Sequence, residues 1–226
     1  MRCSVSADEP ACSFDTTEVM DDMIAAIKQP VDTRKHRPIG ADDGVYFLGR
    51  PHWLTDDLLS HLRQEAQQQR AGAEKIREQH FAELGNVGTS LCESSELLDF
   101  VVTHSQPVTR SGKANYRYYD IPHSHVTPHL DTDQFGLNVI IMLEHDYADE
   151  RRSALLLFAH GPQDPVTLQL EPGEVILFDA AHVVHARTPI SDDGHEVAVN
   201  MGIGFTPEDQ LPNPGFWHPT HGWSPA

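Results

Sequence analysis

The chain has 226 residues, 39% of them hydrophobic and 22% charged, which is ordinary for one globular domain with a sizeable core. Its 34 acidic and 16 basic side chains leave a net charge of −18, and such a field repels nucleic acids and anionic membrane surfaces. No signal-peptide pattern and no apolar run long enough to span a membrane is present. The three cysteines show no C-x-x-C spacing and indicate reduced thiols, so we expect a cytoplasmic protein with neither nucleic-acid nor membrane partners.

The N-terminal part of the chain is polar and acidic. We expect residues 1–43 to form an N-terminal extension that is partly mobile, with one short helix from Thr17 to Gln29, where apolar residues recur at helical spacing. Residues 44–226 then form a single domain, which begins with a short strand between Gly44 and Gly49.

Helical support for the domain is predicted over residues 52–104. Thr55 is a good N-cap, and the amphipathic pattern that follows it continues to about Leu84, with a possible break at Gly72. Residues 85–93 are predicted to be a loop, and residues 94–104 a second helix. A strand followed by a long amphipathic helix suits a layout in which helices cover one face of a sheet.

The pattern changes to short strands after Pro107. Turn residues separate these runs, which is typical of a sandwich or barrel. We therefore expect a mostly β fold with flanking helices (α+β), a jelly-roll core over 113–206 and an irregular tail over 207–226. The expected strands are Asn115–Ile121, Leu137–Leu143, Ala154–Ala159, Val166–Leu170, Val175–Phe178 and Glu196–Phe205.

The last of these strands has two different faces. One face carries only large apolar side chains, from Val197 to Phe205, and should pack on helices or on a second sheet. The other face carries Ala198, Asn200, Gly202 and Gly204. Its small residues indicate either a ligand cavity, with Asn200 as its polar group, or close packing at the glycines.

The most informative motif is His129-Leu130-Asp131. Residues i and i+2 of a strand point to one face, so this imidazole and carboxylate form two corners of a metal site. His185, after a second strand-like run, offers the third ligand. Two His and one carboxylate on one face leave three positions open on an octahedral metal, which is typical of non-haem Fe(II) oxygen chemistry. His182 remains an alternative ligand, and His123 and His125 are further candidates.

These residues resemble a known family. His129-x-Asp131, the strand Tyr116–Asp131 that leads into it, and His185 in the setting Pro-Gly-Glu-Val-Ile-Leu-Phe-Asp…His-Ala-Arg-Thr-Pro are similar to the Fe(II)/2-oxoglutarate-dependent dioxygenases. The resemblance implies a double-stranded β-helix core, Fe(II) held by His129, Asp131 and His185, and 2-oxoglutarate and O2 as co-substrates that give succinate and CO2. Because a carboxylate stands at position 131, the resemblance disfavours halogenation and favours hydroxylation, with desaturation and ring formation as alternatives.

The far carboxylate of 2-oxoglutarate needs a cation. Many family members supply an Arg from the last core strand, but Ser191 to Phe205 contains neither Arg nor Lys. Arg187 is the nearest candidate, with Thr188 and Tyr118 as further co-substrate contacts. Arg117 or Lys113, on the strand before the metal motif, is the alternative, and a guanidinium suits a carboxylate better than an ammonium does.

The expected substrate is a small polar metabolite such as a free amino acid, contacted by Arg117, Asn200 and Asp133. A second interpretation is a cupin-like metal-binding protein, an isomerase or sensor, without turnover of 2-oxoglutarate. The missing cation on the last strand favours this second interpretation. The pattern carries no indication of the oligomeric state.

Overall fold

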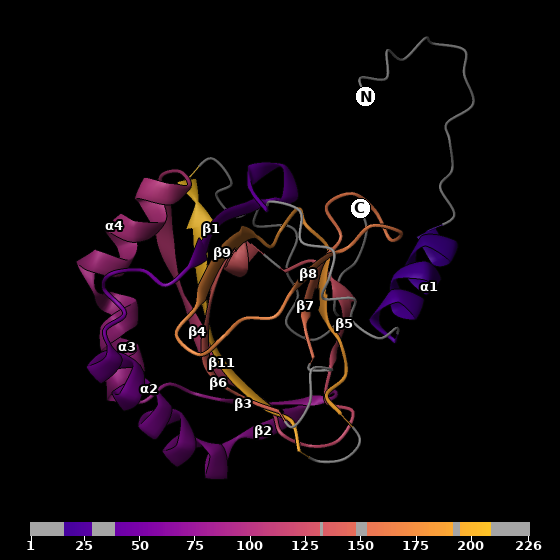
Figure 1. Ribbon diagram of the computed structural model, residues 1–226. Coiled ribbons are helices and arrows are strands. Elements are labelled where there is room, and N and C mark those ends of the chain that lie inside the picture. Colours follow the sequence, from indigo (N-terminus) through magenta and orange to yellow (C-terminus); the bar gives the residue numbers. More distant parts are fainter. Residues whose placement is uncertain (1–15, 29–38, 132, 148–152, 192–194, 209–226) are drawn as a thin grey trace.

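The computed structural model describes residues 16–28, 39–131, 133–147, 153–191 and 195–208 (Figure 1). Most of the expected N-terminal extension and the tail from 209 onward lie outside these ranges, so the mobility expected of the extension and the irregular structure expected of the tail stay predictions. None of the helices in these ranges has the length and apolar character needed to cross a membrane.

Two antiparallel sheets face each other and form the centre of the molecule. The larger has the strand order β1-β9-β6-β11-β4-β3-β2, and the smaller has the order β5-β10-β7-β8. Strands far apart in sequence are neighbours in both sheets, and this architecture confirms the predicted mostly β fold with flanking helices. The strands are β1 (Val45–Gly49), β2 (Glu74–Ile76), β3 (Gln79–Ala82), β4 (Val108–Tyr119), β5 (Val126–His129), β6 (Leu137–Asp146), β7 (Leu155–Leu157), β8 (Val166–Leu168), β9 (Val175–Asp179), β10 (His185–Arg187) and β11 (Val197–Pro207).

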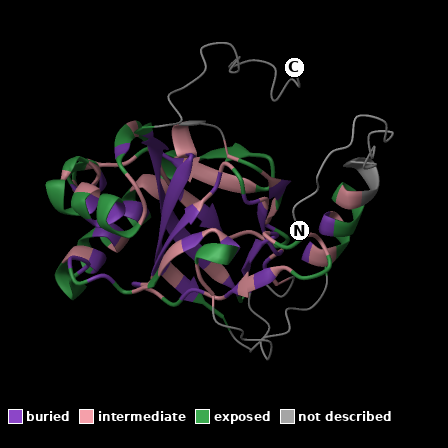
Figure 2. Cartoon of the chain, turned by 90° about the horizontal axis from the view of Figure 1, so that it is seen from above, coloured by how far each residue is buried: buried purple, intermediate pink, exposed green. Residues whose placement is uncertain are grey.

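Helices cover the outer faces of both sheets. α2 (Asp56–Gln69), α3 (Asn86–Glu93) and α4 (Ser95–His104) lie against the larger sheet, and α1 (Thr16–Ile27) lies against the smaller one (Figure 1). The side chain of Thr55 accepts a hydrogen bond from the backbone N–H of Leu58 at 3.2 Å, as expected of an N-cap. Figure 2 shows the result from above: exposed residues on the outward faces of the helices and buried residues along the strands.

The region between α2 and α4 differs from the prediction in two places. The expected helix does not continue to Leu84: after a 3-10 turn at Arg70–Gly72 the chain forms the hairpin β2–β3. β3 is held by pairing with β4, a distant partner that local helix propensity does not report. Residues 85–93 were expected to be a loop, but they form α3.

The N-terminus of α3 explains why this helix could not be predicted from the local sequence. No side chain of its own caps this helix, because Gly85 stands at the N-cap. The carboxylate of Glu65, on α2, accepts hydrogen bonds from the backbone N–H groups of Gly85, Val87 and Gly88 at 3.1, 2.7 and 2.8 Å. A carboxylate at the positive end of the helix satisfies its free donors, and here it comes from another element.

The two faces of β11 behave as predicted. Val199, Met201, Ile203 and Phe205 are buried against the helix layer, whereas Asn200 on the opposite face lines the space between the sheets. The glycines on that inner face serve close packing as well. A Cβ at 202 would overlap the guanidinium of Arg117, and one at 204 would overlap the backbone of the 3-10 helix Asp133–Phe135.

Candidate metal site and cavity

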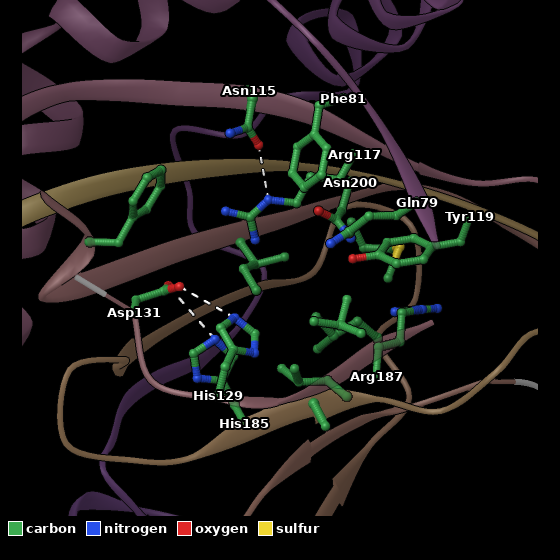
Figure 3. A pocket seen from close by; sticks show the side chains of 17 residues that line it. Gln79, Phe81, Asn115, Arg117, Tyr119, His129, Asp131, His185, Arg187 and Asn200 are labelled. Carbon is green, nitrogen blue, oxygen red and sulfur yellow. Dashed lines mark hydrogen bonds and ion pairs between the residues drawn. The ribbon is translucent and has the colours of Figure 1, made fainter. Parts of the chain in front are cut away.

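Strand pairing brings together the three residues of the metal motif. In the antiparallel pair β5–β10, His129 lies directly opposite His185. Asp131 follows β5, and its carboxylate oxygens lie 3.4 Å from Nε2 of His129 and 3.7 Å from Nε2 of His185. One ligand atom from each residue falls within 4.8 Å of the other two, a spacing that suits a single metal ion (Figure 3).

Both imidazoles are oriented by backbone carbonyls. Nδ1 of His129 donates to the carbonyl of Thr127 at 2.9 Å, and Nδ1 of His185 donates to that of Val183 at 3.1 Å. A carbonyl only accepts, so the proton sits on Nδ1 and the lone pair of Nε2 is directed at the site. Burial lowers the pKa of His185 to about 4, against the opposing influence of Asp131, and this keeps the ring neutral as a metal ligand must be.

The carboxylate of Asp131 is held in place and ionised. Nδ2 of Asn138, on β6, donates to its Oδ2 at 2.8 Å. Burial by itself raises the pKa of Asp131, but its interaction with His129 and the charges of His185 and Arg117 outweigh burial and lower the pKa to about 2. The donor set is therefore two imidazoles and one carboxylate, with a supporting hydrogen bond to each ligand.

The other candidate ligands do not join this group. His182 is exposed, and its Nδ1 contacts Oδ1 of Asp179 at 2.9 Å. His123 is exposed and His125 is half-buried, and Nδ1 of His125 contacts the backbone carbonyl of His123 at 2.7 Å. Within the described ranges, only His129, Asp131 and His185 form a cluster of His, Cys, Asp or Glu with metal spacing.

A cavity of about 200 Å³ opens beside the three ligands, between the two sheets. Its wall is largely apolar. Besides the three ligands, the charged side chains among the described lining residues are Arg117 and Arg187. The protein is strongly acidic as a whole, so this local positive charge is a specific property of the cavity. The polar lining residues besides the ligands are Gln79, Asn115, Arg117, Tyr119, Arg187 and Asn200 (Figure 3).

Arg187 is placed in this wall by β10, two residues beyond His185. Its side chain is buried, Nη2 donates to Oγ of Ser153 at 2.7 Å, and the guanidinium carbon lies 4.7 Å from the centre of the Tyr119 ring. Nε has no hydrogen-bond partner among the described residues. Burial lowers the pKa of Arg187, and the nearby Tyr119 and Glu196 oppose this effect.

Thr188 and Tyr118, the two predicted helpers of Arg187, do not reach the cavity. Oγ1 of Thr188 accepts from the backbone N–H of Ala154 at 2.8 Å within the buried strand layer. The hydroxyl of Tyr118 donates to the carbonyl of Ala66 in α2 at 2.7 Å, on the helix side of the sheet. Strand alternation turns the next residue, Tyr119, into the cavity instead.

Tyr119 lines the cavity on the same strand face as Arg117, although Tyr118 and not Tyr119 was predicted to contact the co-substrate. Its ring is buried, and burial raises the pKa of its hydroxyl against the opposing influence of Arg117, Arg187 and a hydrogen bond from Asn200. The alternation Arg117–Tyr118–Tyr119 contained the signal, because Tyr119 shares a face with Arg117. Gln79 had no such signal, since it lay within a predicted helix.

The predicted substrate contacts are partly brought together. Arg117 and Asn200 are opposite each other in the β4–β11 pair, and both line the cavity. Asp133 begins a 3-10 helix beside the metal ligands, but its side chain is not among those described. Lys113, the alternative cation, is exposed and does not line the cavity.

Comparison with known proteins gives relatives by structure alone. No protein-family model matches the chain, and no curated protein sequence matches it. The non-heme alpha ketoglutarate dependent epimerase SnoN from nogalamycin biosynthesis superposes with a TM-score of 0.61 at 13% identity, covering 74% of this chain and 77% of that one. A Pseudomonas putida prolyl-4-hydroxylase gives 0.55 at 16%, covering 71% and 91%.

A third structural neighbour was solved with a metal ion and 2-oxoglutarate bound. HygX from Streptomyces hygroscopicus, solved with nickel and 2-oxoglutarate bound, gives a TM-score of 0.56 at 12% identity, covering 74% of this chain and 85% of that one. At such identities the likeness establishes the fold. The chain therefore has the double-stranded β-helix fold of the Fe(II)/2-oxoglutarate oxygenases, as the resemblance of its motifs predicted.

Proposed function

We propose that this protein is an Fe(II)/2-oxoglutarate-dependent dioxygenase that hydroxylates an unactivated C–H bond of a small polar metabolite such as a free amino acid. The observation that carries the proposal is the pairing of a two-His, one-carboxylate group with a cavity that contains a buried guanidinium. The fold supports it, because structural neighbours with this fold bind a metal and 2-oxoglutarate. The compact cavity supports a small substrate.

His129, Asp131 and His185 would hold Fe(II) from one side and leave its other side open to the cavity. When bound, iron with 2-oxoglutarate supplies activated oxygen: O2 gives one atom to the substrate C–H bond and the other to succinate, with loss of CO2. The protein orients both imidazoles through backbone carbonyls, holds Asp131 through Asn138, and excludes bulk water with the apolar wall.

Arg187 and Tyr119 suit the far carboxylate of 2-oxoglutarate. The guanidinium is deeper than Arg117, stacks on the Tyr119 ring and has a free Nε. The phenolic O–H of Tyr119 lies in the same wall of the cavity and can donate to an acceptor on a ligand. A buried carboxylate with two such donors is bound through charge-assisted hydrogen bonds.

The cupin-like interpretation loses its main support. It rested on the absence of a cation from the last strand, and that absence would leave the co-substrate without a partner. The cavity instead receives Arg187 from β10 and Arg117 from β4, so a cation is available without one on β11.

The proposal is tested by adding 2-oxoglutarate to Fe(II)-loaded protein without oxygen and recording the visible charge-transfer band of the chelate. The expected result is a saturable band that is lost in Asp131→Ala. Succinate release in the presence of O2 and a metabolite library then identifies the substrate. Iron binding without a band would overturn the assignment of 2-oxoglutarate and return the cupin-like alternative.

A further inference from the structure

Arg117 is a second cation in the cavity, and its surroundings are built to hold it there. Nε donates to Oδ1 of Asn115 at 2.9 Å, and the guanidinium carbon lies 5.6 Å from the centre of the Phe135 ring. Gly202 on the neighbouring strand leaves the room that the guanidinium occupies. Figure 3 shows the guanidinium between Asn115 and the metal ligands.

The formal charges of the loaded site leave Arg117 without a counter-ion. A divalent iron and Arg187 carry three positive charges, and Asp131 with dianionic 2-oxoglutarate carries three negative ones. Arg117 is then uncompensated, and no acidic side chain in the described lining other than Asp131 can balance it. A half-buried cation beside a largely apolar wall is only partly solvated, so an anionic group of the substrate would supply its remaining partner.

Two hydrogen-bond acceptors in the same cavity are also unused. Of the six buried side-chain polar atoms without a partner in the described structure, three belong to cavity residues: Oδ1 of Asn200, Oε1 of Gln79 and Nε of Arg187. The co-substrate 2-oxoglutarate carries only acceptors when ionised, so it can satisfy Arg187 but neither amide oxygen. Buried acceptors without a partner are rare, and these two call for a donor from another molecule.

We infer that the substrate is a small monocarboxylate, or an equivalent monoanionic group, bound by Arg117, and that it also carries an N–H or O–H donor for Asn200 and Gln79. This rests on the proposed function, which it deepens by naming the chemistry of the substrate. Arg117 and Asn200 face each other across β4 and β11 beside the metal ligands. A substrate held by both is thereby placed over the open side of the metal.

The test uses three-carbon probes on the anaerobic Fe(II)·2-oxoglutarate complex. Propionate carries the anion alone, propionamide is its neutral counterpart, and L-lactate and L-alanine add an O–H or N–H donor. Binding is followed by the change in the visible band and by thermal unfolding at constant ionic strength. Arg117→Gln removes the charge, Lys113→Gln removes an equal charge on the same strand outside the cavity, and Asn200→Val removes the amide.

The expected result is saturable binding of propionate and none of propionamide. Arg117→Gln should lower the affinity for propionate at least about tenfold, whereas Lys113→Gln should leave this affinity unchanged. Lactate or alanine should bind more tightly than propionate, and Asn200→Val should abolish that difference. The 2-oxoglutarate affinity of Arg117→Gln should stay within about threefold of the wild type.

Three results would overturn the inference. Propionate and propionamide would bind with equal affinity, propionate would still bind to the Arg117→Gln variant, or propionate would abolish the visible band by displacing 2-oxoglutarate. Equal affinity for propionate, lactate and alanine would overturn the assignment of the donor. If no band forms even in wild-type protein, the proposed function fails. The thermal-unfolding arm on Fe(II)-loaded protein then still decides whether Arg117 binds a monoanion.

Discussion

Replacement of Arg187 by Gln should weaken the binding of 2-oxoglutarate without destabilising the protein. In the free protein the guanidinium is buried, bonded to the uncharged hydroxyl of Ser153, and stacked on Tyr119 with Nε unpaired. No carboxylate of the described residues contacts it directly, although Glu196 is close enough to influence its pKa. A buried cation held in this way is a cost to folding that ligand binding can repay.

The size of the effect follows from this environment. Truncating one partner of a buried, hydrogen-bonded charge pair costs about 2–5 kcal/mol. At 1.4 kcal/mol for each factor of ten, the Kd for 2-oxoglutarate should rise by about 30-fold to a few thousand-fold. Without ligand, the removal of an unpaired buried charge should leave the free energy of unfolding unchanged or raise it by about 1 kcal/mol, which is about 2–4 °C in Tm for a chain of this size.

The assay measures both quantities on the same samples. Anaerobic titration of the visible band gives the Kd, and thermal unfolding with and without 2-oxoglutarate gives the stability. Arg187→Lys should fall between wild type and Arg187→Gln, because an ammonium keeps the charge but loses the fork geometry. Lys113→Gln is the matched control for loss of one exposed positive charge.

Two outcomes would refute the reasoning. A loss of several kcal/mol of stability in ligand-free Arg187→Gln would show that Arg187 holds the strand layer together and is not a ligand group. An unchanged Kd for 2-oxoglutarate with an intact fold would show that its far carboxylate binds elsewhere, with Arg117 as the first candidate.

Three further predictions concern the metal, the α2–α3 contact and the packing around Arg117. His129→Ala should weaken Fe(II) more than about 100-fold, as measured by anaerobic metal titration, and tight binding in this variant would exclude His129 as a ligand. Glu65→Gln should lower the free energy of unfolding by about 2–4 kcal/mol at neutral pH, because the carboxylate accepts three backbone N–H bonds and one from the Tyr116 hydroxyl. Burial raises the pKa of Glu65, but these four hydrogen bonds together lower it below 4.5. The stabilisation should therefore be complete above that pH and fade as the pH falls through the folded-state value, so a denaturant series showing a constant difference down to acidic pH would contradict it. Gly202→Ala should displace the Arg117 guanidinium and weaken propionate while leaving the 2-oxoglutarate band intact, and an unchanged propionate affinity would show that the packing at 202 does not position Arg117.

The structure brings together the three predicted metal ligands, whereas the predicted contacts around them are only partly in the cavity. His129 and Asp131 could be paired from a spacing of two on a strand, and the two faces of β11 could be separated by the same alternation. Tyr118 was predicted to contact the co-substrate, but it cannot share a strand face with Arg117 and Tyr119, which line the cavity. The hydroxyl of Tyr118 contacts α2 instead.

The sequence by itself predicted most of the strands and the N-cap at Thr55 through periodicity, because these are properties of neighbouring residues. The class of the fold and the triad of His129, Asp131 and His185 followed from this pattern together with the resemblance of the motifs to a known family. Only the tertiary structure decided that His129 faces His185 across β5 and β10, that Glu65 caps α3, and that two guanidiniums enter one cavity. The physical reason is that hydrogen bonds, charge partners and burial are supplied by elements far apart in sequence. A local pattern indicates which chemical group a residue carries, whereas the packing of the two sheets determines which other residue that group contacts.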